Sequence, residues 1–250
     1  MTNLATTFNP NTPHIIYEGG LEYRLGTLEG NLIQYDFAKV VKYLGVKGKL
    51  LFGKDFKLYD EDKELLLKLA SYFVGDESSC SKYDLEVSKG LLLTGPVGCG
   101  KTTLMRLLPH LTPHRRAYEF MPCRNITFGF NHLGHKIIED YATTKPYCFD
   151  DLGVEQTGKH FGQDCNVMGE ILISRYEIFK NLTPHNNSPS GGLKWTRGQG
   201  ARGLKGSLTH VTTNLNADEL QEKYGERVRS RMREMFNLIS FDENSVDKRK

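Results

Sequence analysis

The sequence predicts an α/β fold in which a parallel sheet carries helices on both faces. From about residue 90 onward, short apolar stretches alternate with longer stretches whose apolar residues recur at helical spacing. A glycine-rich loop, GPVGCG at 95–100, separates the first apolar stretch from the first helical one. A second apolar stretch, 146–153, contains two adjacent acids. Such alternation is typical of a parallel sheet, which binds ligands beyond the carboxyl ends of its strands.

Length and composition fit a water-soluble globular protein. The chain has 250 residues, of which 38% are hydrophobic and 25% charged, and its net charge of +3 says little about partners. The apolar runs are too short for a membrane span, and the polar start at 1–13 differs from a signal peptide. Five cysteines without a C-x-x-C pair argue against a zinc site and a disulfide framework. We therefore expect a cytoplasmic protein that does not contact the membrane.

The first third, residues 1–85, is predicted to be a small N-terminal extension and a candidate for binding a partner. It holds several tyrosines, scattered glycines and one helix-like piece at 35–46. A second helix is predicted over 59–75, with Asp60 as its cap, acids in its first turn and leucines on one face. A polar link then leads to the strand at 91–94.

The residues after this strand match the phosphate-binding pattern G-x-x-x-x-G-K-[ST]. Glycines let successive backbone N–H groups point at phosphate oxygens, and the following helix adds the positive end of its dipole. Lys101 is expected to reach the β- and γ-phosphates, and Thr102 to ligate Mg²⁺. ATP and Mg²⁺ are therefore the predicted cofactors. The predicted nucleotide-binding residues are Gly95, Pro96, Val97, Gly98, Cys99, Gly100, Lys101, Thr102 and Thr103.

The rest of the chain alternates between predicted helices and strands. The helices are expected at 102–108, 128–142, 166–181 and 217–235. The strands are expected at 117–122, 146–153, 208–216 and 236–242. This order of elements predicts the parallel sheet.

Polar side chains at two strand ends complete the predicted site. In YCFDDLG, Asp150 is expected to hold Mg²⁺, and Asp151 to orient an attacking water. In VTTNLN, Thr213 and Asn214 are expected at the end of another strand, where Asn214 can bond the γ-phosphate or the water. Because the carboxyl ends of parallel strands meet at one edge, these groups should converge on Lys101.

The sequence from 88 to 245 resembles the DnaC/IstB family of AAA+ ATPases, through the runs YCFDDLG, EILISRYEIF and VTTNLNADELQEKYGERVRSRMREMFNLISF. Members of this family are bacterial and phage helicase loaders and the ATP-dependent helpers of certain transposases. The resemblance implies a P-loop NTPase domain of the AAA+ type over 86–250, with ATP bound between subunits of a homo-oligomer. It does not extend to the first third of the chain.

The resemblance also implies roles for single residues. Lys101 and Thr102 match the Walker A pair, Asp150 and Asp151 the Walker B pair, and Asn214 the sensor-1 position. Arg231 matches an arginine finger that reaches the ATP of a neighbouring subunit, and Arg227, one helical turn earlier, is the reserve candidate. The family's sensor-2 element is not evident here, and Arg249 or Lys248 is the candidate for that role.

Residues 184–206 form a basic, glycine-rich insertion where family members commonly have a short loop. It contains the single tryptophan of the chain, and cations beside an aromatic side chain are typical of single-stranded DNA binding. A surface loop that happens to be basic is the alternative interpretation. The candidate DNA-binding residues are Lys194, Trp195, Arg197, Arg202 and Lys205.

Four functions are compatible with these observations. The preferred hypothesis is an ATPase of the helicase-loader type that acts in DNA replication, assembles on single-stranded DNA or on a replicative helicase, and hydrolyses ATP. A transposition helper that partners a transposase is the second. A superfamily-three-type helicase and a small-molecule kinase share the phosphate-binding loop. The short chain and its DnaC-like C-terminal segment disfavour the helicase, and the Asp-Asp and Thr-Thr-Asn strands disfavour the kinase.

Overall fold

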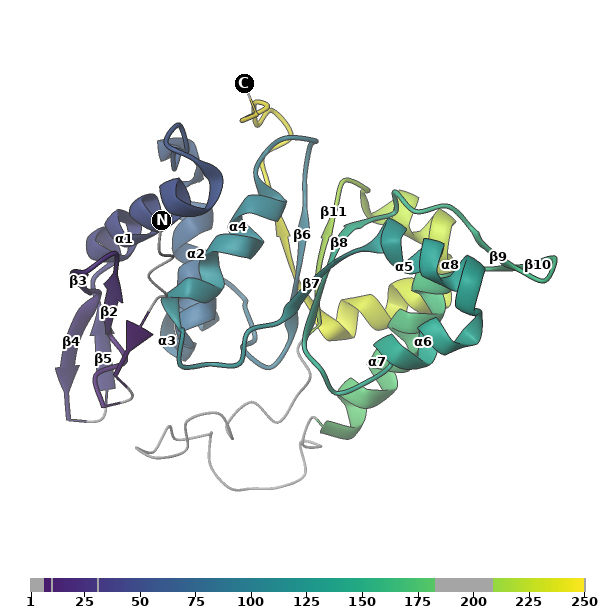
Figure 1. Cartoon of the computed structure of the whole chain (residues 1–250), viewed down its shortest axis with the longest axis horizontal. Helices are drawn as coiled ribbons and strands as arrows, with labels where there is room; N and C mark the ends of the chain where they lie inside the picture. Colours follow the sequence, from purple (N-terminus) through teal and green to yellow (C-terminus); the bar gives the residue numbers. More distant parts are fainter. Residues whose placement is uncertain (1–6, 10, 31, 183–208, 250) are drawn as a thin grey trace. The chain divides into compact units, whose positions relative to one another are not determined.

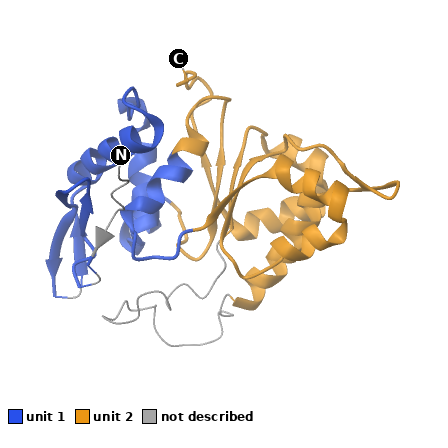
Figure 2. Ribbon diagram, viewed as in Figure 1, with its two compact units in different colours: residues 1–83, 104–117, 190–203 blue, residues 84–103, 118–189, 204–250 orange. Residues whose placement is uncertain are grey.

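The computed structural model describes residues 7–9, 11–30, 32–182 and 209–249. Their contacts divide into two compact units, shown in Figure 2. Of the described residues, unit 1 contains those up to 83 together with 104–117, and unit 2 contains 84–103 and everything from 118 onward. Residues 104–117 fall in the predicted ATPase domain but group with unit 1, and the division into an extension and an ATPase domain stays a prediction.

Unit 2 is built around a five-stranded sheet in the order β12-β6-β11-β8-β7, and every neighbouring pair is parallel (Figure 1). In chain order the strands are β6 (Gly90–Thr94), β7 (Glu119–Pro122), β8 (Tyr147–Leu152), β11 (Thr209–Thr213) and β12 (Phe236–Ser240). The central strands β6, β8 and β11 are buried along most of their length, as short apolar strands of a parallel sheet should be. The predicted α/β fold with a parallel sheet is confirmed.

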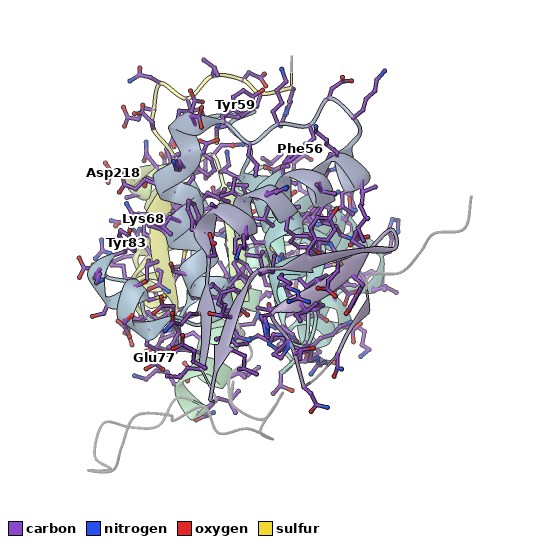
Figure 3. The ribbon with its side chains drawn as sticks, turned by 90° about the vertical axis from the view of Figure 1, so that its left-hand side faces the viewer. Phe56, Tyr59, Lys68, Glu77, Tyr83 and Asp218 are labelled. Carbon is purple, nitrogen blue, oxygen red and sulfur yellow. The ribbon has the colours of Figure 1, made fainter. Side chains whose placement is uncertain are left out.

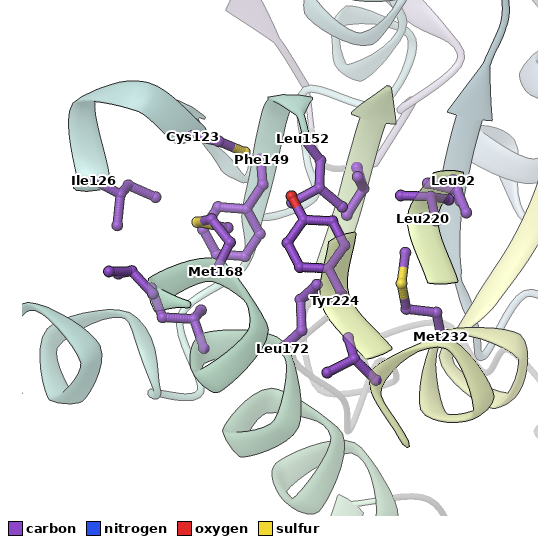
Figure 4. Close-up of a cluster of buried hydrophobic side chains, with 14 of the residues drawn as sticks. Leu92, Cys123, Ile126, Phe149, Leu152, Met168, Leu172, Leu220, Tyr224 and Met232 are labelled. Carbon is purple, nitrogen blue, oxygen red and sulfur yellow. The ribbon is translucent and has the colours of Figure 1, made fainter. Parts of the chain in front are cut away.

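The helices of unit 2 share one hydrophobic core with the sheet (Figure 4). They are α5 (Cys123–Leu133), α6 (His135–Tyr141), α7 (Val167–Leu182) and α8 (Ala217–Met235). Leu92 of β6 packs into this core. The side chains of Leu91 and Leu93 point to the opposite face of the strand, and they are fully buried as well. Both faces of β6 are therefore covered. Helix α4 (Lys101–Leu107) follows β6 after the glycine-rich loop.

Two glycines interrupt helices that the sequence predicts as continuous. The helix expected at 128–142 is two helices, because Gly134 has a φ of 60° and a ψ of −142°. The first of them begins earlier than predicted, at Cys123, directly after Pro122. In α8, Gly225 has a φ of 81° and a ψ of 161°, which breaks the helix between its first and second halves. Only glycine adopts such angles readily.

The structure also contains a hairpin that the sequence analysis did not predict. Strands β9 (Gly158–His160) and β10 (Gln163–Cys165) pair antiparallel and project beyond the helices of unit 2 (Figure 1). Asn131 of α5 holds its base, because the Asn131 side chain accepts a bond from the Lys159 N–H at 2.7 Å. At the tip, Phe161 has a φ of 48° and a side chain that is 95% exposed.

A buried arginine joins α7 to the sheet. Arg175 is fully buried, and it donates to the Thr209 hydroxyl at 2.7 Å and to the backbone oxygens of Tyr141, Thr143 and Lys145 at 2.8 to 3.0 Å. Burial lowers its pKa to about 10, so the guanidinium still carries its charge at neutral pH. Arg175 thereby fixes the turn that leads into β8.

Unit 1 combines small antiparallel sheets with helices. Its strands are β1 (Thr7–Phe8), β2 (Ile15–Glu18), β3 (Leu21–Arg24), β4 (Gly26–Glu29) and β5 (Leu32–Tyr35). Strands β1 to β3 form one sheet, and β4 pairs with β5. The helices are α1 (Phe37–Phe52), η1 (Asp60–Asp62), α2 (Lys63–Val74), α3 (Glu77–Lys82) and η2 (Leu108–Leu111), together with most of α4.

The start of the second predicted helix differs from the prediction. Asp60 does not cap α2, because residues 60–62 form a short 3₁₀ turn and α2 begins at Lys63. In the middle of α2, Lys68 lies over the ring of Tyr83, 5.4 Å from its centre (Figure 3). None of the described helices is both long and apolar enough to cross a membrane.

Candidate functional site

The loop after β6 has the backbone geometry that phosphate binding requires. Gly95, Gly98 and Gly100 have φ values of 152°, 85° and 107°, and side chains disfavour this region of backbone space. There is no room for a side chain at Gly95, where a Cβ would stand 2.7 Å from Phe241 Cβ. Positive φ angles of this kind are typical of loops whose N–H groups bind an anion, and α4 starts directly after the loop, at Lys101.

Lys101 connects this loop to Asn214, which follows β11. Its ammonium donates to the Gly95 and Pro96 carbonyl oxygens at 2.8 and 2.7 Å, and to Asn214 Oδ1 at 2.6 Å. The side chain is only 5% exposed. Burial is the main cause that lowers the pKa of Lys101, and Cys99, Asp151 and Asp150 partly offset it. Two loop carbonyls and one amide thus hold the cation where a phosphate could replace them.

Asp150 and Thr102 meet at the carboxyl end of β8. The Thr102 hydroxyl donates to Asp150 Oδ1 at 2.9 Å, and the Thr212 hydroxyl donates to the same oxygen at 2.6 Å. A carboxylate next to a hydroxyl is the kind of hard oxygen donor set that Mg²⁺ prefers. The two residues predicted to hold the metal therefore lie together, and their chemistry fits that ion.

Asp151 and Asn214 are two further polar residues predicted at the strand ends. Asp151 has a φ of 54°, unusual for a residue other than glycine, and its N–H donates to the Thr212 hydroxyl at 3.0 Å. Asn214 follows β11 and bonds Lys101 as described above. Thr213, by contrast, is fully buried and donates to the Leu152 carbonyl at 2.6 Å. It supports the sheet and does not face the site.

The sequence analysis missed two residues of this region. Thr212 joins Asp150 to Asp151, as its hydroxyl bonds both. The alternation of strand side chains could have indicated it, because Thr212 points to the face opposite to that of Thr213. Glu155, only 5% exposed, accepts bonds from the Gly153 N–H at 2.8 Å and from the Tyr224 hydroxyl. No sequence pattern indicates that this acid is buried.

Residues 247–249 lie against the phosphate-binding loop. The Lys248 N–H donates to the Gly98 carbonyl at 3.0 Å, and the Asp247 carboxylate packs against Gly98. The Lys248 ammonium lies 5.7 Å from the centre of the Phe241 ring. Arg249 donates its N–H to Asp247 at 3.0 Å. Of the two sensor-2 candidates, Lys248 is the one whose described contacts include this loop.

The two arginine-finger candidates differ in their surroundings. Arg227 is exposed on the second half of α8. Arg231 is partly buried, with its guanidinium 5.0 Å from the centre of the Tyr176 ring and 4.0 Å from a Glu177 oxygen. It also donates to the backbone carbonyl of Arg227, one helical turn earlier, at 3.2 Å. The candidate DNA-binding residues Lys194, Trp195, Arg197, Arg202 and Lys205 lie outside the described residues.

The strand order, the glycine-rich loop and the convergence of Lys101, Thr102 and Asp150 are those of an α/β P-loop NTPase fold. No protein-family model matches the chain. A segment of 70 residues, 27% of the chain, is 36% identical to the Fe(3+) ions import ATP-binding protein FbpC of Photobacterium profundum. The match covers 20% of FbpC.

Two solved structures are similar in fold. One is the crystal structure of the DnaC helicase loader, with a TM-score of 0.48 and 17% identity over 76% of this chain and 94% of that one. The other is a candidate primosome component from Streptococcus pyogenes serotype M3, with a TM-score of 0.45 and 16% identity over 76% of this chain and 84% of that one. Both TM-scores are below 0.5, so the fold assignment rests on the geometry of this chain itself.

Proposed function

We propose that this protein is an ATPase of the helicase-loader type, which hydrolyses ATP while it delivers a replication protein to DNA. One observation carries the ATPase assignment: at the carboxyl edge of the sheet, the Thr102 hydroxyl bonds the Asp150 carboxylate and the Lys101 ammonium bonds Asn214. The motif order that resembles the DnaC/IstB family supports the loader role.

In the proposed site, different residues would bind the phosphates, the Mg²⁺ ion and the attacking water. The loop N–H groups and Lys101 would bind the phosphates, and Thr102 and Asp150 would hold Mg²⁺, which neutralises charge on the phosphates. Asp151 would accept a bond from the attacking water and orient it, and Asn214 would bond the water or the γ-phosphate. When a phosphate binds Lys101, Asn214 loses that partner and becomes available for this role.

A second subunit would complete the site. An arginine supplied in trans contributes on the order of 10³-fold or more to phosphoryl-transfer rates. The two candidates lie on α8, and the exposure of Arg227 favours it, because Arg231 already contacts Tyr176 and Glu177. ATP would then stabilise a homo-oligomer whose subunits share their sites.

Single-stranded DNA is the proposed nucleic-acid partner. The predicted contact is the basic insertion with Trp195, and the β9-β10 hairpin offers a second one. Its tip presents the exposed Phe161 between His160 and Gly162, with Lys159 exposed one residue further back. An aromatic plate beside cations can stack on a base and bind its phosphates. Phe161→Ala should weaken binding to single-stranded DNA in a filter titration and leave ATP affinity unchanged.

The partner is tested with a variant that binds ATP and hydrolyses it slowly. Asp151→Asn should lower turnover by about 10³-fold, because it removes the base that orients the water. Purified from its native cells with ATP present, this variant should bring a replicative helicase with it. The double variant Asp151→Asn, Lys101→Ala, which cannot hold ATP, is the matched control and should bring none.

Other results of these experiments would change or refute the proposal. Recovery of a transposase would assign the transposition-helper role in place of the loader role. Recovery of DNA without either protein would refute delivery of a protein cargo. Normal turnover by Asp151→Asn, or undiminished ATP affinity of Lys101→Ala, would refute the site itself.

A further inference from the structure

The turn that follows Asp150 and Asp151 is hydrogen-bonded to α8. Glu155 accepts the Gly153 N–H on one carboxylate oxygen and the Tyr224 hydroxyl on the other. From the neighbouring position on α8, the Lys223 ammonium donates to the carbonyl oxygens of Gly153 and Glu155 at 2.6 and 2.8 Å. Two consecutive helix residues therefore hold both the backbone and the side chain of one turn.

This turn starts at Asp151. The Val154 N–H donates to the Asp151 carbonyl at 3.2 Å, and Gly153, with a φ of 104°, packs so closely on Leu215 that a side chain there would collide with it. Leu215 in turn lies next to Asn214. Asp151 and the Gly153 atoms that Glu155 and Lys223 bind therefore belong to one turn.

Lys223 and Tyr224, the residues of α8 that bond the turn, lie directly before the break in the helix. The first half of the helix is fixed by a capping box of Asn216 and Glu219, and the break at Gly225 follows Tyr224. The second half carries Arg227 and Arg231. A Cβ at Gly225 would meet no atom within 4 Å, so only the backbone angles require glycine there.

We infer that Glu155 and Tyr224 are positioning residues, which couple the strand end that carries Asp151 to the arginine-bearing second half of α8. The inference rests on the proposed function, in which that arginine acts on the ATP of a neighbouring subunit. When ATP or its loss moves Asp151, the Glu155–Tyr224 bond carries the movement to the break at Gly225. The second half of α8 then presents its arginine to the neighbouring site or withdraws it.

The chemistry of the pair suits a rigid link. Glu155 and Tyr224 are 5% and 6% exposed, so water does not compete for their bond. Burial, followed by the charge of Glu155, raises the pKa of the Tyr224 hydroxyl, which keeps it a donor. A bond to a buried carboxylate is stronger than one between neutral groups. Removing the hydroxyl leaves the ring in the core and removes the bond to Glu155.

The test is Tyr224→Phe, with Tyr141→Phe as the matched control, because no described hydrogen bond involves the Tyr141 hydroxyl. Turnover is measured over a range of protein concentrations, beside ATP affinity and the melting temperature. For Tyr224→Phe we expect unchanged ATP affinity and a loss of about tenfold in the turnover that depends on subunit association, well short of the ~10³-fold loss of the finger itself. Tyr141→Phe should match the wild type.

Mixed subunits separate positioning from damage to the variant's own site. Lys101→Ala subunits hold no ATP and still offer an arginine, so mixing them with Tyr224→Phe should restore turnover. Subunits with Arg227→Ala and Arg231→Ala offer no finger and should restore none. Failure of Lys101→Ala subunits to restore turnover, or wild-type turnover by Tyr224→Phe, would overturn the inference.

Gly225→Ala is the second variant, because it disfavours the backbone angles of the break and adds no clash. It should show the same loss and the same rescue, and wild-type behaviour would contradict a role for the break. A wild-type protein whose turnover does not depend on its concentration would refute the shared site, and so the proposed function as well as this inference. That result is read from the wild type alone and is therefore distinct from a failure of the variants.

Discussion

The Lys101 ammonium donates to Asn214 Oδ1 across 2.6 Å, and this bond joins the phosphate-binding loop to the end of β11. The two residues are far apart in the sequence and follow β6 and β11, which are neighbouring parallel strands of the sheet. Under the proposed function, a γ-phosphate bound to Lys101 would take the place of Asn214 as its partner. The amide of Asn214 would then bond the phosphate or a water, so this side chain would have different partners in the two states.

Asn214→Ala should therefore retain ATP binding and lose turnover. Lys101 keeps its two carbonyl partners, and the loop keeps its N–H groups, so affinity for a fluorescent ATP analogue should change by less than a few-fold. Turnover should fall by about 100-fold, the usual effect of removing one group that stabilises charge in the transition state. A loss of ATP affinity as large as that of Lys101→Ala would show that Asn214 holds the loop together instead.

Thr212→Val should weaken the response to Mg²⁺. The Thr212 hydroxyl donates to Asp150 Oδ1 and accepts the Asp151 N–H, so valine leaves both groups without this partner. We expect a stability loss of about 1–3 kcal/mol in urea unfolding and a higher Mg²⁺ concentration for half-maximal turnover. Thr212→Ser keeps the hydroxyl and is the control. Equal Mg²⁺ dependence in the two variants would remove Thr212 from the site.

Arg175→Lys should destabilise unit 2 although the charge is kept. Lysine has three donors on one atom and cannot reach the four oxygen acceptors that surround the guanidinium. It also loses the stacking on Tyr147, whose ring centre is 5.1 Å away. We expect the free energy of unfolding to fall by about 3 kcal/mol. Arg124→Lys, at an exposed position, should change it by less than ~0.5 kcal/mol, and a similar effect of both would contradict this role.

The free energy of unfolding should decrease as the pH is lowered, because of His210. Its Nδ1 accepts the Leu91 N–H at 3.1 Å, and burial, followed by the charge of Arg175, lowers its pKa to about 3. The folded state therefore keeps His210 neutral, whereas the unfolded state binds a proton below about pH 6.5. The stabilisation that neutral His210 gives the folded state is complete above that pH. It is lost as the pH falls toward 3, at about 1.4 kcal/mol per pH unit.

The check is urea unfolding of the wild type and of His210→Asn at pH 7.5 and pH 5. Asparagine can accept the Leu91 N–H in place of Nδ1 and does not titrate in this range. The loss of stability between the two pH values should be smaller in the variant. An equal loss in both proteins would assign the pH dependence to other groups, among them the partly buried His114, whose pKa burial lowers to about 4.

Local sequence signals determined the chemistry of this protein. Strand, glycine loop and helix follow one another within 90–107, so neighbouring residues alone build the phosphate-binding loop and place Lys101 in it. The alternation of apolar segments likewise predicted the parallel strands, because a strand buried on both faces has to be apolar throughout. The convergence of Lys101, Thr102, Asp150 and Asn214 followed from the rule that parallel strands share their carboxyl ends.

Only the tertiary structure decided which polar groups are buried and what they bind. Arg175, Glu155 and His210 look like surface residues in the sequence, and each is buried because its partners come from distant segments. The breaks at Gly134 and Gly225 were also decided only in the folded structure, since a glycine inside a helical pattern is compatible with a continuous helix. The sequence thus specified the phosphate-binding groups through local spacing, whereas the link from Asp151 to α8 exists only because folding brings Glu155 against Tyr224.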